Sequence, residues 1–162
     1  MPSVIPELGG LRSSELLALS RAILAELRRR GVVRTGNAPA GDYAELLVRE
    51  AVGGELAPNS QRSWDVLTTT GERLQVKARL VVDPARRSER EVSIFRSWDF
   101  DAAVLVLFDD SFRVWRAARV PAPVLEAAGR WADHVRGWRV HATDELLDSG
   151  DDWTDSLRRV AD

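Results

Sequence analysis

The sequence predicts a mixed α/β fold (α+β type), with a central mixed β-sheet flanked by helices. Two segments with helical periodicity come first, at 12–30 and 42–52, and strand-like runs follow at 64–69 and 73–82. Residues 102–108 then form a continuous apolar run, which is typical of a central strand covered on both faces. Helices before and after such strands favour one sheet with helices packed against it.

The two N-terminal segments have the features of amphipathic helices. In the first, Ser13 or Ser14 can cap the start, and three arginines before Gly31 suit the negative end of the helix dipole. Its apolar residues recur at helical spacing: Leu16, Leu19, Ile23 and Leu27. The second ends at a pair of glycines and has its own apolar stripe: Ala44, Leu47, Val48 and Ala51. Glu45 lies beside that stripe.

The remaining predicted elements are shorter. The two strand-like runs are separated by a turn around Thr70-Gly71, and residues 83–91 form a charged loop. Residues 112–118 alternate in polarity, as expected of a partner for the apolar run. The end of the chain predicts a short helix, another strand and a terminal helix: 121–128, 135–141 and 151–160.

Size and composition limit the class of protein. A chain of 162 residues is expected to form a single domain with a substantial core. No apolar run approaches the length of a membrane span, and the N-terminus does not resemble a signal peptide, so we expect no membrane association. The absence of cysteine fits a cytoplasmic protein and excludes thiolate metal sites. With only two histidines, any metal is expected to be a hard cation bound by oxygen.

The charge of the chain is unevenly distributed. A net charge of −2 argues against a protein that coats nucleic acid by bulk electrostatics. However, residues 60–97 carry eight basic residues against five acidic ones, whereas residues 143–155 carry six carboxylates and no base. We therefore expect a local basic face. The arginines expected to contact nucleic acid are in or beside this region: Arg62, Arg79, Arg86, Arg87 and Arg90.

Lys77 is the only lysine among the 23 basic residues. An ammonium group on a flexible stem can lower its pKa and act on a water molecule, which a guanidinium group cannot do. Asp65 lies ten positions before Gln75, with a turn between them. Gln75 and Lys77 point to the same face because side chains alternate along a strand. A carboxylate, a turn and then a carboxamide two residues before a lysine is a pattern of metal-dependent nucleases.

These residues suit the hydrolysis of a phosphodiester bond with Mg²⁺, for which Mn²⁺ can substitute. Mg²⁺ takes oxygen ligands and is held by one or two protein carboxylates with waters. We expect Asp65 to be the main ligand. The other expected ligands are the Gln75 side-chain oxygen, the Val76 backbone carbonyl and Glu45, directly or through water. Lys77 would orient or deprotonate the attacking water and screen charge in the transition state.

Taken together, the residues resemble the PD-(D/E)xK restriction-endonuclease-like superfamily. The matching pieces are Gly41-Asp-Tyr-Ala-Glu45-Leu-Leu, Trp64-Asp65 and Gln75-Val-Lys-Ala-Arg79. The Gln-Val-Lys run is similar to Mrr-type restriction nucleases, in which glutamine replaces the usual acid, and the longer pattern is similar to small bacterial proteins of that fold. The resemblance covers residues 34–108 and implies a nuclease core there, with 109–162 completing the fold. It also implies a metal-dependent DNA endonuclease, with restriction or defence as a candidate role.

Two departures from the family pattern bear on activity. Trp64 stands where the family has proline, and Gln75 removes one negative charge from the site, so weak Mg²⁺ binding is expected. A second hypothesis is therefore a non-cleaving module with the nuclease fold, which binds nucleic acid or a protein partner. A third takes residues 14–50 as a helix-turn-helix regulator, but its second helix has few of the positive side chains that recognition needs.

The sequence also bears on the oligomeric state of the protein and on further metal ligands. Trp131, Trp138 and Trp153 predict a homodimer through the region after residue 120, since tryptophan is enriched at interface hot spots. The alternative is that these tryptophans complete the monomer core. A partner subunit is a further source of specificity, because the chain has no separate recognition domain. Asp99 and Asp101 flank the entrance of the apolar strand, where they are candidates either for an additional metal ligand or for ordinary turn carboxylates.

Overall fold

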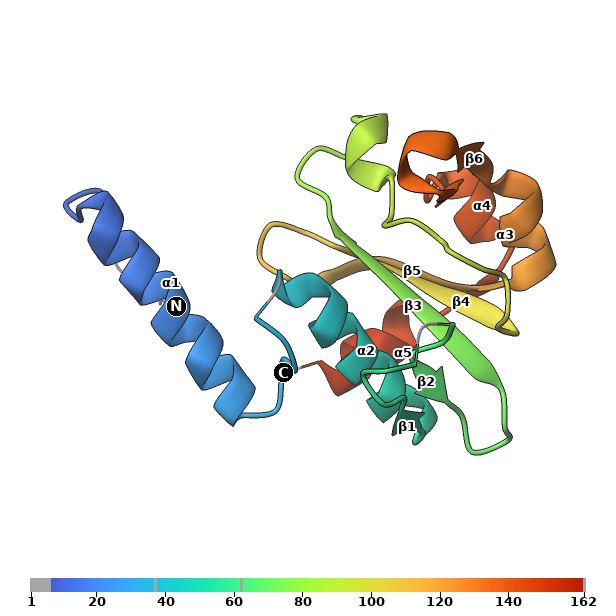
Figure 1. Cartoon of the computed structure of the whole chain (residues 1–162), viewed down its shortest axis with the longest axis horizontal. Helices are drawn as coiled ribbons and strands as arrows, with labels where there is room; N and C mark the ends of the chain where they lie inside the picture. Colours follow the sequence, from blue (N-terminus) through green and yellow to red (C-terminus); the bar gives the residue numbers. More distant parts are fainter. Residues whose placement is uncertain (1–6, 37, 62, 162) are drawn as a thin grey trace. The chain divides into compact units, whose positions relative to one another are not determined.

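A computed structural model describes residues 7–36, 38–61 and 63–161 of the chain (Figure 1). The chain divides into two compact units, Met1–Pro39 and Ala40–Asp162. The first unit contains helix α1 (Ser13–Arg29), and the second contains the β-sheet with its flanking helices. Within the described ranges, no helix combines the length and apolar character that crossing a lipid bilayer requires.

The second unit is built on a six-stranded mixed sheet, which confirms the predicted α/β class. Its strand order is β1-β2-β3-β4-β5-β8. The strands are β1 (Glu55–Leu56), β2 (Val66–Leu67), β3 (Arg73–Leu80), β4 (Ala102–Phe108), β5 (Val114–Pro121) and β8 (Asp151–Asp152). Only β3 and β4 pair in parallel; the other neighbours are antiparallel. The parallel pair requires a crossover, residues 81–101, which contains a 3₁₀ turn at Arg87–Arg90.

Strand β4 is the centre of the core, and all seven of its residues are buried. One set of its side chains (Ala103, Leu105 and Leu107) joins one hydrophobic cluster, and the alternate set (Val104, Val106 and Phe108) joins the other. This double coverage explains why the segment lacks any polar alternation.

Each face of the sheet has its own cover. Helices α2 (Pro39–Val52) and α5 (Thr154–Val160) pack on one face, through residues such as Leu47 and Leu157. The other face carries the crossover, helices α3 (Ala122–Ala128) and α4 (Asp144–Asp148), and a small hairpin of β6 (Arg130–Ala132) and β7 (Gly137–Arg139). Figure 1 shows the crossover, α3, α4 and the hairpin gathered on one side of the sheet.

The predicted helix at 12–30 is confirmed as α1, and none of its side chains is buried. Charges fix its last turn. Glu26 accepts hydrogen bonds from Arg29 and Arg30, which lower the pKa of that carboxyl to about 2. The pattern of arginines before Gly31 is thus a C-terminal feature of the helix, as the dipole argument predicts.

Several element boundaries differ from the prediction. Helix α2 begins at Pro39 rather than residue 42, because proline is well suited to the first turn of a helix. The predicted strand at 135–141 is a 3₁₀ turn (Asp133–Val135) followed by the three residues of β7. The predicted terminal helix at 151–160 begins with strand β8, and α4 was not predicted.

Candidate active site

The site is organised by the hairpin of β2 and β3. The turn between them closes with the Thr68 hydroxyl, which accepts a hydrogen bond from the Glu72 N–H at 2.9 Å. Gly71 adopts a positive φ of 87°, which glycine tolerates without strain. The turn directs β2 back along β3 and brings Asp65 opposite Gln75 and Val76.

Asp65 ends the ladder of backbone hydrogen bonds between β2 and β3. Its side chain, instead of a backbone carbonyl, accepts the hydrogen bond from the Val76 N–H. Its Oδ2 atom accepts a hydrogen bond from the Val76 N–H at 2.7 Å and another from Gln75 Nε2 at 2.6 Å. Its own N–H donates to the Leu74 carbonyl at 2.8 Å. This explains why β2 begins at Val66 rather than at the predicted residue 64, and the turn that begins at Thr68 ends it at Leu67 rather than at 69. The same contacts hold the carboxylate in place against β3.

Lys77 lies on the face of β3 that Gln75 shares, as strand alternation predicts. Its ammonium group donates to the Ile94 carbonyl at 3.0 Å and lies 5.0 Å from the centre of the Phe95 ring. Both partners belong to the crossover, which covers the half-buried side chain. Burial lowers the pKa of Lys77 below its ordinary value of 10.5.

The electrostatic neighbours of Lys77 show which charges share this region. The carboxylates of Asp65 and Glu45 oppose the effect of burial and raise the pKa of Lys77, whereas the Arg96 guanidinium lowers it. Glu45 reaches this position from α2, where it is half-buried. The structure thus brings Asp65, Gln75 and Val76 into direct contact, and it places Glu45 and Asp65 in the electrostatic field of Lys77.

The donor set is chemically suited to a hard cation. Asp65 and Glu45 supply carboxylate oxygens and Gln75 supplies an amide. The Val76 carbonyl lies on the same edge of β3 as its N–H, since both groups of a residue face one side of a strand. Gln75 turns its amide nitrogen toward Asp65, so ligation requires a half-turn of the amide to present its oxygen. In the described part of the chain, no three acidic or histidine side chains form a metal-holding group.

The arginines predicted to contact nucleic acid differ in their exposure to solvent. Arg79, Arg86 and Arg87 are exposed, on β3 and in the crossover. Arg62 lies outside the described residues. Arg90 is held inside the fold: its side chain is only 11% exposed and bonds to Asp144 at 2.6 Å and to the Ala142 carbonyl at 2.8 Å.

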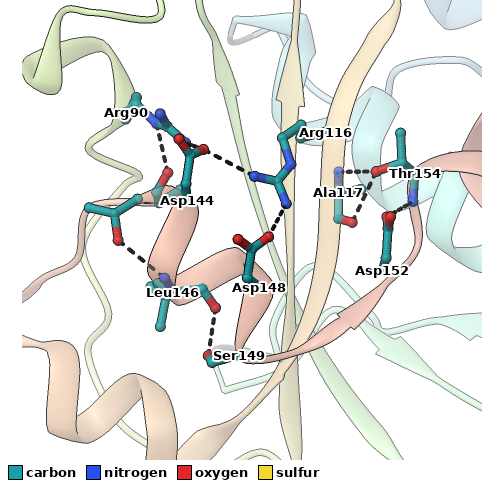
Figure 2. Close-up of polar contacts among 11 residues, drawn as sticks. Arg90, Arg116, Ala117, Asp144, Leu146, Asp148, Ser149, Asp152 and Thr154 are labelled. Atoms are coloured by element: carbon teal, nitrogen blue, oxygen red, sulfur yellow. Dashed lines mark hydrogen bonds and ion pairs between the residues drawn. The ribbon is translucent and has the colours of Figure 1, made fainter.

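Arg90 belongs to a charge network that ties three elements together (Figure 2). Arg116 of β5 bonds to Asp144 at 3.0 Å and to Asp148 at 2.7 Å. Asp144 is therefore shared by an arginine of the crossover and one of β5. These contacts raise the pKa of Arg116 and lower that of Asp144. Part of the acidic segment 143–155 thus serves as internal counterions for the fold.

Asp99 and Asp101 also have a partner within the fold. The Arg73 guanidinium bonds to Asp99 at 2.9 Å, and the Arg73 N–H donates to Asp101 at 2.7 Å. The hydrogen bonds that Asp101 accepts from the Arg73 N–H and from the Arg73 guanidinium lower its pKa. The two carboxylates therefore fix the starts of β3 and β4 relative to each other.

Three crossover residues that shape the site were not singled out from the sequence. Ile94 supplies the carbonyl that receives Lys77, Phe95 supplies the ring beneath it, and Arg96 contributes to its field. The apolar residues of this stretch, Val92, Ile94 and Phe95, are a signal for a buried segment. It does not reveal which strand that segment crosses.

Comparison with known proteins adds no further assignment, since no family model matches the chain and a search of curated proteins finds no relative.

Proposed function

We propose that this chain is a metal-dependent endonuclease that hydrolyses phosphodiester bonds in DNA, with restriction or defence as its candidate role. The observation that carries the proposal is the setting of the only lysine. Lys77 is half-buried, has a lowered pKa, and lies in the field of two carboxylates, Asp65 and Glu45. A solvated strand lysine has none of these features. Perturbed ionisable groups of this kind cluster at functional sites.

Under this proposal, Mg²⁺ or Mn²⁺ is held by Asp65, Glu45, the Gln75 side-chain oxygen and the Val76 carbonyl. When bound, the metal supplies Lewis acidity for a water molecule and for the phosphate oxygens. Lys77 orients the attacking water or takes its proton, because a lowered pKa makes the neutral amine more accessible than it is in a solvated lysine. In its charged form the same group stabilises negative charge on the phosphate.

The DNA backbone is proposed to run along the exposed arginines near the site. Arg79 follows Lys77 on the same face of β3, and Arg86 and Arg87 lie in the crossover. Arg86 has acidic neighbours at 3.5 and 4.0 Å, so of the two crossover arginines Arg87 is the stronger phosphate contact. Arg62 stays a predicted contact. Arg90 is engaged by Asp144 and is better assigned to the stability of the fold.

The test is cleavage of supercoiled plasmid and branched DNA by the wild type with Mg²⁺, with Mn²⁺ and with a chelator. Asp65→Ala and Lys77→Ala should each abolish cleavage and keep a cooperative melting transition. Arg159→Ala is a matched control, because Arg159 is an exposed arginine on α5, on the other face of the sheet. Cleavage that persists in the Lys77 variant, or that needs no metal, would exclude the proposed mechanism.

The second candidate is a non-cleaving module that binds nucleic acid or a protein partner. The observation in its favour is the hydrogen bond from Gln75 Nε2 to Asp65, which satisfies the carboxylate without a cation. This module should bind DNA with the same affinity in chelator and in Mg²⁺. We further propose a homodimer, since cutting both strands of a duplex takes two sites, a partner subunit that supplies sequence specificity, and a cytoplasmic location.

A further inference from the structure

The hairpin of β6 and β7 presents an exposed aromatic side chain. Of the six tryptophans, all within the described residues, only Trp131 is exposed, with 52% of its surface accessible. Its ring packs edge-on against Trp138 with 4.7 Å between ring centres. Its Nε1 donates to Asp133 at 2.7 Å, which fixes the orientation of the indole. The hairpin thus holds a large aromatic surface in solvent in a defined position.

The hairpin also carries exposed arginines. Arg130 and Arg136 are exposed, and among the described residues neither forms an ion pair. Arg96 donates to the carbonyls of Val135 and Arg136, the latter at 3.1 Å, and these neutral acceptors leave its charge uncompensated. The only carboxylate within residues 130–139 is that of Asp133, which accepts from Trp131. Arg139 of β7 pairs with Glu91 at 2.8 Å, so Arg130 and Arg136 are the hairpin arginines with no acidic partner among the described residues.

The hairpin is also fixed relative to Lys77. Trp138 and Phe95 exchange backbone hydrogen bonds of 2.9 and 3.0 Å. A side chain at Gly137 would meet Ile94 Cγ2 at 2.1 Å and the Phe95 carbonyl oxygen at 2.7 Å, so the hairpin lies close against this part of the crossover. Ile94 is the residue whose carbonyl receives the Lys77 ammonium. One short segment of the crossover thus contacts the proposed catalytic lysine on one side and the hairpin on the other.

We propose that the β6–β7 hairpin binds an unpaired segment of DNA beside the active site, with Trp131 stacking on a base and Arg130 and Arg136 contacting phosphates. This inference rests on the proposed function, because it assigns that site a substrate with unpaired nucleotides. A duplex offers phosphates but keeps its bases stacked on one another. An exposed indole on a hairpin that also carries exposed arginines therefore favours single strands, where bases are free to stack on it.

The test is fluorescence anisotropy with a labelled oligothymidylate of about 16 nucleotides, a length at the upper end of single-strand site sizes. A duplex of the same length serves as the second probe, and chelator prevents cleavage. Trp131→Ala should weaken single-strand binding by about tenfold and change duplex binding little, given the usual strength of base stacking. Trp131→Phe, which keeps an aromatic ring, should restore most of the loss. Arg130→Ala with Arg136→Ala should weaken both probes and reduce the salt dependence of binding.

Arg159→Ala is again the control, since it removes one exposed positive charge on the other face of the sheet. Unchanged single-strand affinity in folded Trp131→Ala, or equal losses for both probes, would overturn the inference. The readout needs no metal. If Trp131-dependent binding is seen without plasmid cleavage, the proposed function fails and the DNA site stands. If cleavage is seen without Trp131-dependent binding, the proposed function stands and the single-strand site on the hairpin fails.

Discussion

At the scale of single residues, the most informative one is Lys77. A single lysine makes its titration unambiguous, because isotope labelling of lysine gives one ε-ammonium signal by NMR. We predict a pKa below 10.5, since burial disfavours the charged form. Asp65→Asn should lower this pKa further, because it removes a carboxylate that stabilises the charge. Arg96→Met should raise it. A titration at the ordinary value in the wild type would mean that the site is open to water.

The same shift has a consequence for stability. Because the pKa of Lys77 is lower in the folded than in the unfolded chain, the unfolded chain binds more protons between the two values. The free energy of unfolding should therefore rise with pH in that window. The rise should end near pH 10.5, where the lysine of the unfolded chain also loses its proton. In Lys77→Met this increment should be absent, as a comparison of denaturant unfolding across the window will show.

A second prediction at this scale concerns Gln75. Gln75→Glu adds a negative charge beside Asp65, so it should tighten the binding of Mn²⁺ measured by titration calorimetry. It should also destabilise the metal-free protein, because the hydrogen bond from Gln75 Nε2 to Asp65 becomes a contact between two carboxylates. Gln75→Asn is a matched control, since it keeps an uncharged amide but shortens the side chain by one methylene group. Equal Mn²⁺ affinity in wild type and Gln75→Glu would place this side chain outside the coordination shell.

The sequence was a good guide to the residues of one strand and a poor guide to their partners. Alternation along β3 is a local property, so the shared face of Gln75 and Lys77 followed from it. The pairing of Asp65 with the Val76 N–H depends on the length of the turn between the two strands. The Thr70-Gly71 pair marks where that turn lies but does not fix its length. The Lys77 contact with Ile94 joins residues seventeen apart in sequence across a crossover, and no local pattern encodes it.

At the scale of elements, the crossover and the hairpin act as one support for the site. Gly137→Ala should separate them, because its Cβ would meet Ile94 Cγ2 at 2.1 Å and the Phe95 carbonyl at 2.7 Å. We predict a loss of stability of about 1–3 kcal/mol, as for overpacked cores, together with a shift of the Lys77 NMR signal. The stability is measured by urea unfolding.

Gly41→Ala is the control for this variant, since a Cβ at Gly41 meets nothing within 4 Å. Because Gly41 lies in helix α2, alanine there should stabilise the protein slightly rather than destabilise it, and it should leave the Lys77 signal unmoved. A Gly137→Ala protein with wild-type stability and an unmoved Lys77 signal would contradict the mechanical link between hairpin and site.

Long elements were predicted well from periodicity, and so was the seven-residue helix α3 within the predicted 121–128, whereas the shortest elements were not. The run at 102–108 is confirmed as β4, and the helical patterns are confirmed as α1 and α2. Helix α4 has only five residues and is held by the Thr143 cap and by Arg90 and Arg116. Its charges looked like an acidic surface in the sequence, because their partners lie on distant elements.

At the scale of the whole molecule, the fold class followed from the order of elements, but the role of the tryptophans did not. Trp138 and Trp153 pack against the two core clusters, so they belong to the monomer core. Tryptophan content alone thus supports a dimer less than the sequence suggested. The remaining ground is functional, since double-strand cleavage takes two sites.

We predict that light scattering at micromolar concentration gives a mass of about twice the 18.0 kDa of one chain, in line with the prevalence of two-fold dimers. Trp131→Ala should give the same mass, because the hairpin is assigned to DNA. A particle of 18.0 kDa would rule out the homodimer of the free protein.

The solitary lysine on β3 makes the chain a natural reporter of its own unfolding. A protease that cleaves only after lysine has one target, the bond between Lys77 and Ala78. That bond lies in a strand whose Lys77 is in register with Leu105 of β4, at the centre of the sheet. Because proteases bind extended, unpaired backbone, cleavage should follow the population of molecules in which the sheet has opened. The folded protein should resist such a protease and, when partly unfolded by urea, yield two pieces, 1–77 and 78–162. Any ligand that binds the folded site should slow the appearance of both pieces together.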